Sequence, residues 1–144
     1  MAVSTFDPKS VVISIGGVPI SGFADGTFVS ITTDTQQFTK VVGADGFTTR
    51  VKSNNYGGTL TLSLAQTSPS NDVLSGLLAL DRLSNQGLFP LLIKDMSGNT
   101  VVFSESAWIQ QFPDITFGNE MNNRDWVIDM AEMDIFLGGN EAQA

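Results

Sequence analysis

Four carboxylates close together in the last part of the chain are the first candidates for chemistry. Paired carboxylates catalyse reactions when one is protonated and the other ionised. An extended strand would place the first two on one face and the last two on the other, unless a bulge intervenes. This spacing supports a catalytic pair only weakly, so we expect an acidic face that meets solvent or lines a space, and no enzyme. The residues are Asp125, Asp129, Glu132 and Asp134.

Other kinds of site lack the residues they require. The chain has no Cys and no His, which excludes disulfides, Ser-His-Asp triads, Cys-His pairs and most transition-metal sites. Its glycine pairs at 16–17, 57–58 and 138–139 lack the lysine and the strand-to-helix setting of a phosphate loop. The sequence also lacks the alternating aspartates and distal glutamate of a calcium loop. We expect neither a metal nor a cofactor.

Negative charge is concentrated near the C-terminus. The net charge is −8, and residues 114–144 carry −6 of it because seven acids accompany only Arg124. A protein that grips nucleic acid through its phosphates needs clustered Lys and Arg. Specific binding of nucleic acid is therefore not expected, although nucleic acid could pass nearby without adhering. The plainer interpretation is that the acids keep the surface hydrated.

Length and composition indicate a single domain, residues 1–144. Of the 144 residues 42% are apolar, enough to close a hydrophobic core, to which we assign Trp108, Trp126 and the phenylalanines. No apolar run reaches the roughly 18 residues of a membrane-spanning helix. The first residues show neither a basic patch nor an apolar stretch. We expect no stable membrane insertion by this subunit.

Alternation along residues 58–66 predicts a strand with one buried face and one wet face. Leucines recur at every second position, and small hydroxyl residues stand between them. Residues 27–34 show a similar hydroxyl-rich face. The leucines are Leu60, Leu62 and Leu64, and the polar positions are Thr59, Thr61 and Ser63 in the first run and Ser30, Thr32 and Asp34 in the second.

Turn residues divide much of the remaining chain into hairpins. Asp45-Gly46 marks the tip of a long hairpin near 35–55. A later pair is expected between 115–117 and 126–137, after another hairpin that follows the helix. The short tail 138–144 is expected to be a flexible or docking segment.

One helix is expected near 69–86. An early proline and an acid are typical of its start, and Gly87 is expected to end it. Its apolar side includes Leu80 and Leu83. A single amphipathic helix among strands would cover the end of a sheet. We predict a mainly β fold, a barrel or sandwich with one flanking helix.

Several segments follow one another in a distinctive order. They are 43–46, Arg50, 54–57, the alternating strand to Leu64, 66–72, and 126–137 followed by Gly138-Gly139-Asn140. In this order, over most of the chain, the sequence resembles the tail tube proteins of contractile-tailed bacteriophages.

The resemblance implies a β-barrel-like structural subunit that forms hexameric rings, stacked as a tube inside a contractile sheath. Such a tube conducts DNA from the capsid into the host during ejection. The implied partners are further copies of the chain, the tail sheath protein, and baseplate and tail-terminator proteins. The implied location is the virion tail, after synthesis in the host cytoplasm.

A lumen for DNA should be polar and should not bind phosphate, which fits a wall of Ser, Thr and acids. We therefore expect one set of residues to face the channel: Ser30, Thr32, Asp34, Thr59, Thr61 and Ser63, with Asp125 and Asp129 in addition. The hairpin tip and the tail would contact neighbouring subunits or the next ring, because exposed β edges need a partner or protection. These residues are Val42, Gly43, Asp45, Phe47, Gly138, Gly139 and Asn140.

Two other functions remain open. A tube of a related secretion or bacteriocin-like injection machine would share the ring fold but carry a different cargo. A monomeric β-sandwich binding module would be distinguished by its mass in solution.

Overall fold

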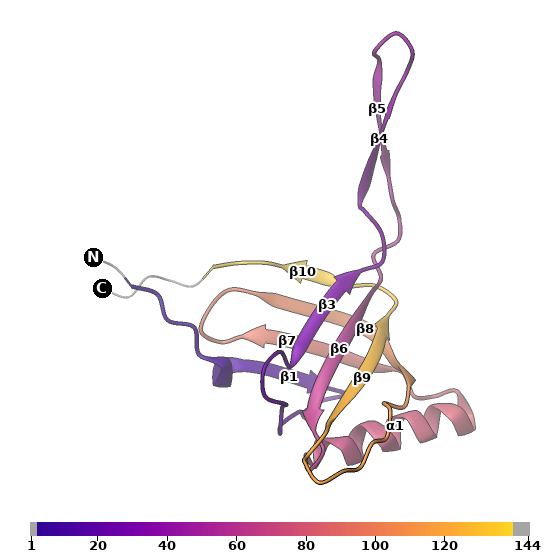
Figure 1. Ribbon diagram of the computed structural model, residues 1–144. Coiled ribbons are helices and arrows are strands. Elements are labelled where there is room, and N and C mark those ends of the chain that lie inside the picture. The colour runs from indigo at the N-terminus through magenta and orange to yellow at the C-terminus, as the bar shows by residue number, and fades with distance from the viewer. Residues whose placement is uncertain (1–2, 140–144) are drawn as a thin grey trace.

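The strands form one curved sheet from which a long hairpin projects (Figure 1). The structure is a computed structural model, and it describes residues 3–139. Strand order in the sheet is β2-β1-β7-β8-β9-β6-β3, and β10 pairs with β8. The strands are β1 (Val11–Ile15), β2 (Val18–Pro19), β3 (Val29–Thr33), β4 (Phe38–Val42), β5 (Thr48–Lys52), β6 (Gly58–Ala65), β7 (Phe89–Asp95), β8 (Val101–Gln111), β9 (Asn123–Met130) and β10 (Asp134–Phe136). The helices are the short 3-10 helix η1 (Pro8–Ser10) and α1 (Ser70–Ser84). This mainly β architecture with one flanking α-helix confirms the predicted fold class.

Strand β6 has one buried face and one wet face. Leu60, Leu62 and Leu64 are completely buried, whereas the residues between them are partly exposed. The strand pairs over its full length with β9, and Leu62 lies opposite the buried Trp126. Period-two alternation thus directs the leucines into the core and the hydroxyl groups away from it.

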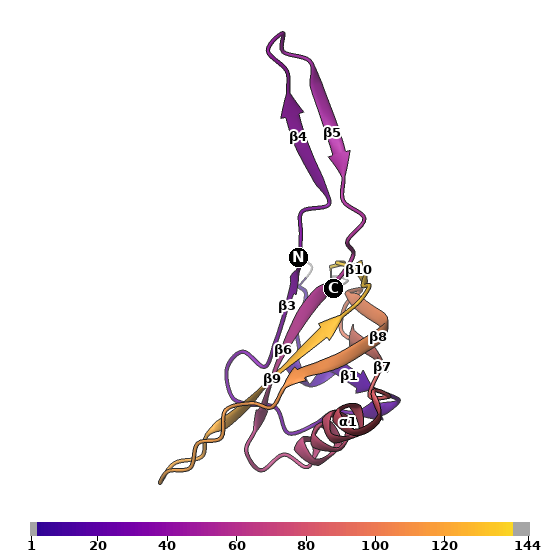
Figure 2. The same ribbon diagram turned by 90° about the vertical axis from the view of Figure 1, so that its right-hand side faces the viewer.

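A bend in β8 lets the sheet curve around this core. The register between β7 and β8 shifts between Phe89 and Leu91, so that residues of β8 bulge out of the ladder. The first part of β8 pairs with β7 and β10, and its last part pairs with β9. In Figure 2 the β1–β7–β8 strands cross the β3–β6–β9 strands, and the core lies in the angle between them.

Helix α1 lies beneath the lower end of the curved sheet (Figure 1). It buries Leu74 and Leu78 against the core. Asn71, in its first turn, donates a hydrogen bond to the carbonyl of Ala65 at the end of β6, and accepts one of 2.9 Å from the indole of Trp126 on β9. These bonds fix the helix start against two neighbouring strands, and they give partners to the partly buried Asn71 side chain and to the indole of the buried Trp126.

Three expectations about strands and burial were wrong. Residues 115–117 form no strand, because β8 continues to Gln111 and its partner β9 begins only at Asn123. Leu80 and Leu83 are exposed, since α1 contacts the core through its other side.

Among the aromatic residues, Trp126 and Phe89 belong to the buried core, whereas Trp108 is only partly buried. Six of the phenylalanines are exposed: Phe6, Phe38, Phe47, Phe112, Phe117 and Phe136.

The end of the helix also differs from expectation. Asn85 adopts the left-handed conformation that ends α1, and its N–H bonds to the carbonyl of Asp81. Gly87 is needed for a different reason, because a Cβ there would lie 2.7 Å from the carbonyl oxygen of Leu77. In the described part of the chain no helix has the length and apolar character needed to cross a membrane.

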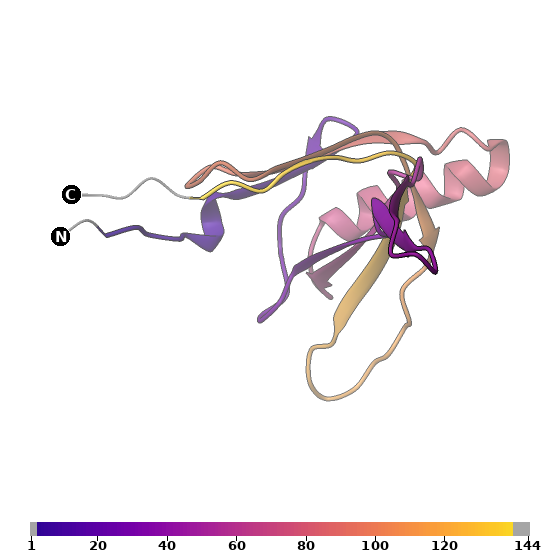
Figure 3. The same ribbon diagram turned by 90° about the horizontal axis from the view of Figure 1, so that it is seen from above.

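The first and last described segments leave the body on the same side (Figure 1 and Figure 3). The β4–β5 hairpin leaves from the upper end, beyond β3 and β6, and every residue of both its strands is exposed. Its two ends are held together by a 2.7 Å bond from the N–H of Ser53 to the carbonyl of Gln37. The hairpin therefore adds nothing to the core.

Replacing Leu62 by Ala should lower the free energy of unfolding by about 3 kcal/mol, because the side chain is fully buried and would leave a cavity. Thr61→Ala, on the other face of the same strand, should cost less than about 1 kcal/mol. Chemical denaturation of both variants measures the difference, and equal losses would contradict the assigned faces.

Replacing residues 38–52 with a two-residue Asn-Gly turn should leave the body folded. The free energy of unfolding should change by less than about 1 kcal/mol, because no core contact is removed. Circular dichroism and denaturant titration test this, and loss of the cooperative transition would show that the hairpin supports the core.

Candidate functional site

Most of the residues expected to share a polar surface lie on one face of β3, β6 and β9. We call this surface the polar face and define it by Ser30, Thr32, Thr59, Thr61, Ser63, Asp125 and Asp129. Register aligns them in rows across the sheet: Thr32 lies opposite Thr59, which lies opposite Asp129. Asp34 lies just beyond the end of β3, where its N–H bonds to the carbonyl of Gly57.

Cross-strand hydrogen bonds organise the two carboxylates of the polar face. The hydroxyl of Ser63 donates to Asp125 at 2.7 Å, and the hydroxyl of Thr59 donates to Asp129 at 3.3 Å. Both carboxylates are held by neutral donors, and the seven residues include no cation. This surface is therefore hydrophilic and negatively charged, and it would repel phosphate groups.

Two residues that the sequence analysis did not include also belong to this side of the sheet. Trp108 lies opposite Asp129, and Val127 lies opposite Thr61, so both continue the rows of the polar face. Both are partly buried. Trp108 stands between Ala107 and Ile109, which are both buried. Because neighbouring residues of a strand point to opposite faces, this apolar pair is the sequence signal that could have placed Trp108 outside the core.

The four carboxylates considered for acid–base chemistry do not come together. Asp125 and Asp129 are on the polar face, whereas Glu132 and Asp134 line a separate hollow of about 220 Å³ beside Glu105, where the chain bends between β9 and β10. Within residues 3–139 no cluster of acidic residues is arranged to hold a metal ion. The four carboxylates therefore form two separate groups and no single cluster.

The tip of the β4–β5 hairpin is a compact turn with exposed apolar residues. Gly46 has φ = +86°, and the side chain of Asp45 accepts a hydrogen bond from the N–H of Phe47. The N–H of Gly43 bonds to the carbonyl of Phe47 at 2.8 Å and closes the turn. Phe47 is 72% exposed and Val42 is 56% exposed, so the tip presents apolar surface that the rest of residues 3–139 leaves uncovered.

The described part of the tail lies against the β7–β8 turn. The carbonyl of Gly138 accepts a hydrogen bond from the hydroxyl of Thr100, and that of Gly139 accepts one from the N–H of Asn99. A Cβ on Gly138 would lie 2.5 Å from the Cβ of Asn99, which explains the glycine. Asn140 is outside the described residues.

One edge of the sheet and the inner side next to it are open. β3 is the last strand in the sheet order, so among the described residues its outer edge has no partner strand. An apolar groove of about 630 Å³ runs between β3 and the β1–β7–β8–β10 side, and its lining includes Val29, Ile31, Ile93, Val102 and Ile135.

Comparison with known proteins identifies the family to which these features belong. Residues 7–138 match the model of the family described as Bacteriophage PhiTE tail tube protein. The chain is 44% identical to structural protein ORF10 of Pseudomonas phage KPP10, over 96% of this chain and 84% of that protein.

Solved structures show the same fold at low sequence identity. The anti-feeding prophage cap, a tube-terminating cap, has a TM-score of 0.65 at 12% identity, covering 94% of both chains. The PVC sheath/tube terminator of an extracellular contractile injection system has a TM-score of 0.64 at 12% identity, covering 92% of this chain and 97% of that one.

The family match and the phage relative confirm the resemblance drawn from the sequence. The chain belongs to the bacteriophage PhiTE tail tube protein family, and it is a structural protein of the phage virion and not an enzyme.

Proposed function

We propose that this chain forms hexameric rings that stack into the tail tube, and that the polar face lines a channel through which DNA passes during ejection. The observation that carries this proposal is the polar face itself, three adjacent strands with hydroxyl groups, two carboxylates and no cation. DNA slides past such a surface without being held, because binding to its phosphates needs Lys or Arg. Asp34, at the end of β3, extends this lining.

Assembly into rings is supported by the open edge of the sheet. Among residues 3–139 no strand pairs with the outer edge of β3, and an apolar groove lies beside this strand. Natural proteins cover or pair such edges. A neighbouring subunit in the ring would cover both features. Contacts between rings would use the hairpin tip, through Val42, Gly43, Asp45 and Phe47, and the tail residues Gly138, Gly139 and Asn140.

The sheath, baseplate and tail-terminator proteins are the proposed partners of the assembled tube. The fold is shared with a tube-terminating cap and with a sheath/tube terminator of injection systems. The fold alone therefore fits an injection-machine tube as well. The 44% identical relative is a phage protein, which favours a tube that carries DNA.

Negative-stain electron microscopy of the concentrated protein, with and without the baseplate proteins of its phage, tests the proposed assembly. Hollow rings or stacks are expected. A particle that stays monomeric in both conditions would contradict the tube and favour a monomeric binding module.

Phe47→Ser should prevent stacking, because it removes the apolar side chain of the hairpin tip. Leu83→Ser is the matched control, since Leu83 is also exposed but belongs to no proposed contact. Sedimentation and microscopy should show few tubes for the first variant, normal tubes for the second, and folded subunits for both. Normal tubes from Phe47→Ser would remove the tip from the inter-ring contact.

Thr59→Lys combined with Thr61→Lys should slow DNA ejection, because each subunit would add two cations to the channel wall. The delay should shrink as salt is raised. Ser84→Lys with Gln86→Lys adds the same charge near the end of α1 and should have little effect. Ejection rates measured on virions carrying each variant compare the two, and equal rates would place the polar face outside the channel.

A further inference from the structure

One face of the β4–β5 hairpin carries three of the seven cations in the chain. Lys40 lies directly opposite Arg50, and Phe38 lies opposite Lys52, so alternation puts all four on the same face. We call this surface the basic face. With Asp45 as its only acid, the hairpin has a net charge of +2, whereas the rest of the chain carries −10.

The Lys40–Arg50 pair is unfavourable in an isolated hairpin. Like charges directly opposite each other across two antiparallel strands repel. The guanidinium of Arg50 lies 4.2 Å from the centre of the Phe38 ring, a contact that orients Arg50 but leaves its charge in place. Within residues 3–139 no carboxylate forms an ion pair with either cation. The basic face therefore fits an anionic partner outside its own subunit.

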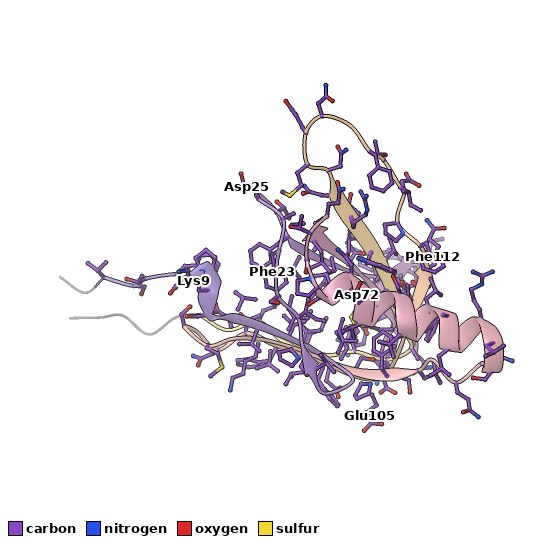
Figure 4. All side chains as sticks on the ribbon, turned by 90° about the horizontal axis from the view of Figure 1, so that it is seen from below. Lys9, Phe23, Asp25, Asp72, Glu105 and Phe112 are labelled. Atoms are coloured by element: carbon purple, nitrogen blue, oxygen red, sulfur yellow. The ribbon has the colours of Figure 1, made fainter. Side chains whose placement is uncertain are left out.

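The opposite end of the molecule is acidic. The connection between β8 and β9, residues 112–122, points away from the hairpin in both Figure 1 and Figure 2. Asp114 and Glu120 on this connection are exposed. Asp72, in the first turn of α1, is exposed as well, and Figure 4 shows its place on the helix as seen from below. We call the surface formed by Asp72, Asp114 and Glu120 the acidic end.

Arg124, the cation nearest in sequence to Glu120, does not neutralise the acidic end. Arg124 is only 9% exposed and donates a 3.4 Å hydrogen bond to the carbonyl of Thr116. Its guanidinium lies 5.3 Å from the centre of the Phe117 ring. The guanidinium is thus turned into its own subunit, and the exposed carboxylates remain available to a partner.

On the basis of the proposed function, we propose that the basic face of one subunit binds the acidic end of a second copy of this chain in the next ring. The two surfaces lie at opposite ends, so the contact joins copies head to tail and repeats without closing. Each five-residue strand of the hairpin spans on the order of 17 Å, enough to carry its cations past the upper end of the body. Complementary charge also fixes the direction of stacking, because like ends repel.

DNA is the other polyanion in a tail tube, but it fits the basic face less well. Only three cations lie on this face, and the rest of the same subunit carries −10. A second subunit offers fixed carboxylates at the end that stacking brings to the hairpin. The contact should therefore be seen in tube assembly, and binding to free DNA should be weak.

Paired charge reversals test this contact. The hairpin variant is Lys40→Glu with Arg50→Glu, the end variant is Asp114→Lys with Glu120→Lys, and the exchanged variant combines all four and keeps the net charge of −8. The control is Arg82→Glu with Lys94→Glu, two exposed cations outside both surfaces. Circular dichroism of unassembled subunits checks that each variant folds.

The sedimentable tube fraction, confirmed by electron microscopy, should fall by at least about tenfold at low salt for the hairpin variant and for the end variant. The control should assemble like the wild type, and the exchanged variant should form tubes again but should not enter wild-type tubes. Wild-type assembly should weaken as salt rises.

Unchanged tubes from the hairpin variant, or no recovery in the exchanged variant, would overturn the contact while leaving the proposed function intact. Absence of wild-type tubes even with baseplate proteins would overturn both. A hairpin variant that forms normal tubes but loses binding to double-stranded DNA would show that the basic face binds nucleic acid instead.

Discussion

The pairing of β6 with β9 is the constraint on which the rest of the structure depends. All eight residues of β6 are in register with β9, from Gly58 opposite Met130 to Ala65 opposite Asn123. Because side chains alternate with a period of two, a slip of one residue would exchange the leucines with the hydroxyl residues. The same register therefore closes the core and creates the polar face. Asn71 ties both strands to α1 at the lower end, through Ala65 and Trp126.

The hairpin follows a different constraint from the body. Its residues are exposed on both strands and its ends are already joined where it leaves the sheet. Since its sequence does not have to serve the core, it can carry features that an isolated subunit would not favour, such as the facing pair Lys40 and Arg50. Features of this kind are explained more readily by contacts between subunits than by the stability of one subunit.

Local patterns in the sequence predicted much of the fold, and contacts distant in sequence account for the rest. Alternation around Leu62 indicated a half-buried strand, and Asp45-Gly46 indicated the hairpin tip. Residues 115–117 look like a strand, but whether they pair depends on where β8 and β9 meet. The exposure of Leu83 and the position of Trp108 likewise depend on which neighbour covers each face. The hydrogen bond from Trp126 to Asn71 joins residues 55 apart, and no local pattern indicates it. Alternation did place most of the polar face, because its residues on each strand recur at every second position.

The most direct test of the proposed channel is a cryo-electron microscopy reconstruction of the assembled tube at a resolution that shows side chains. We expect a hollow stack in which Ser30, Thr61 and Asp129 face the central channel, while Leu60, Leu62 and Leu64 remain inside each subunit. A tube in which the β3–β6–β9 surface instead faces outward, or lies buried between neighbouring subunits, would contradict the proposed channel.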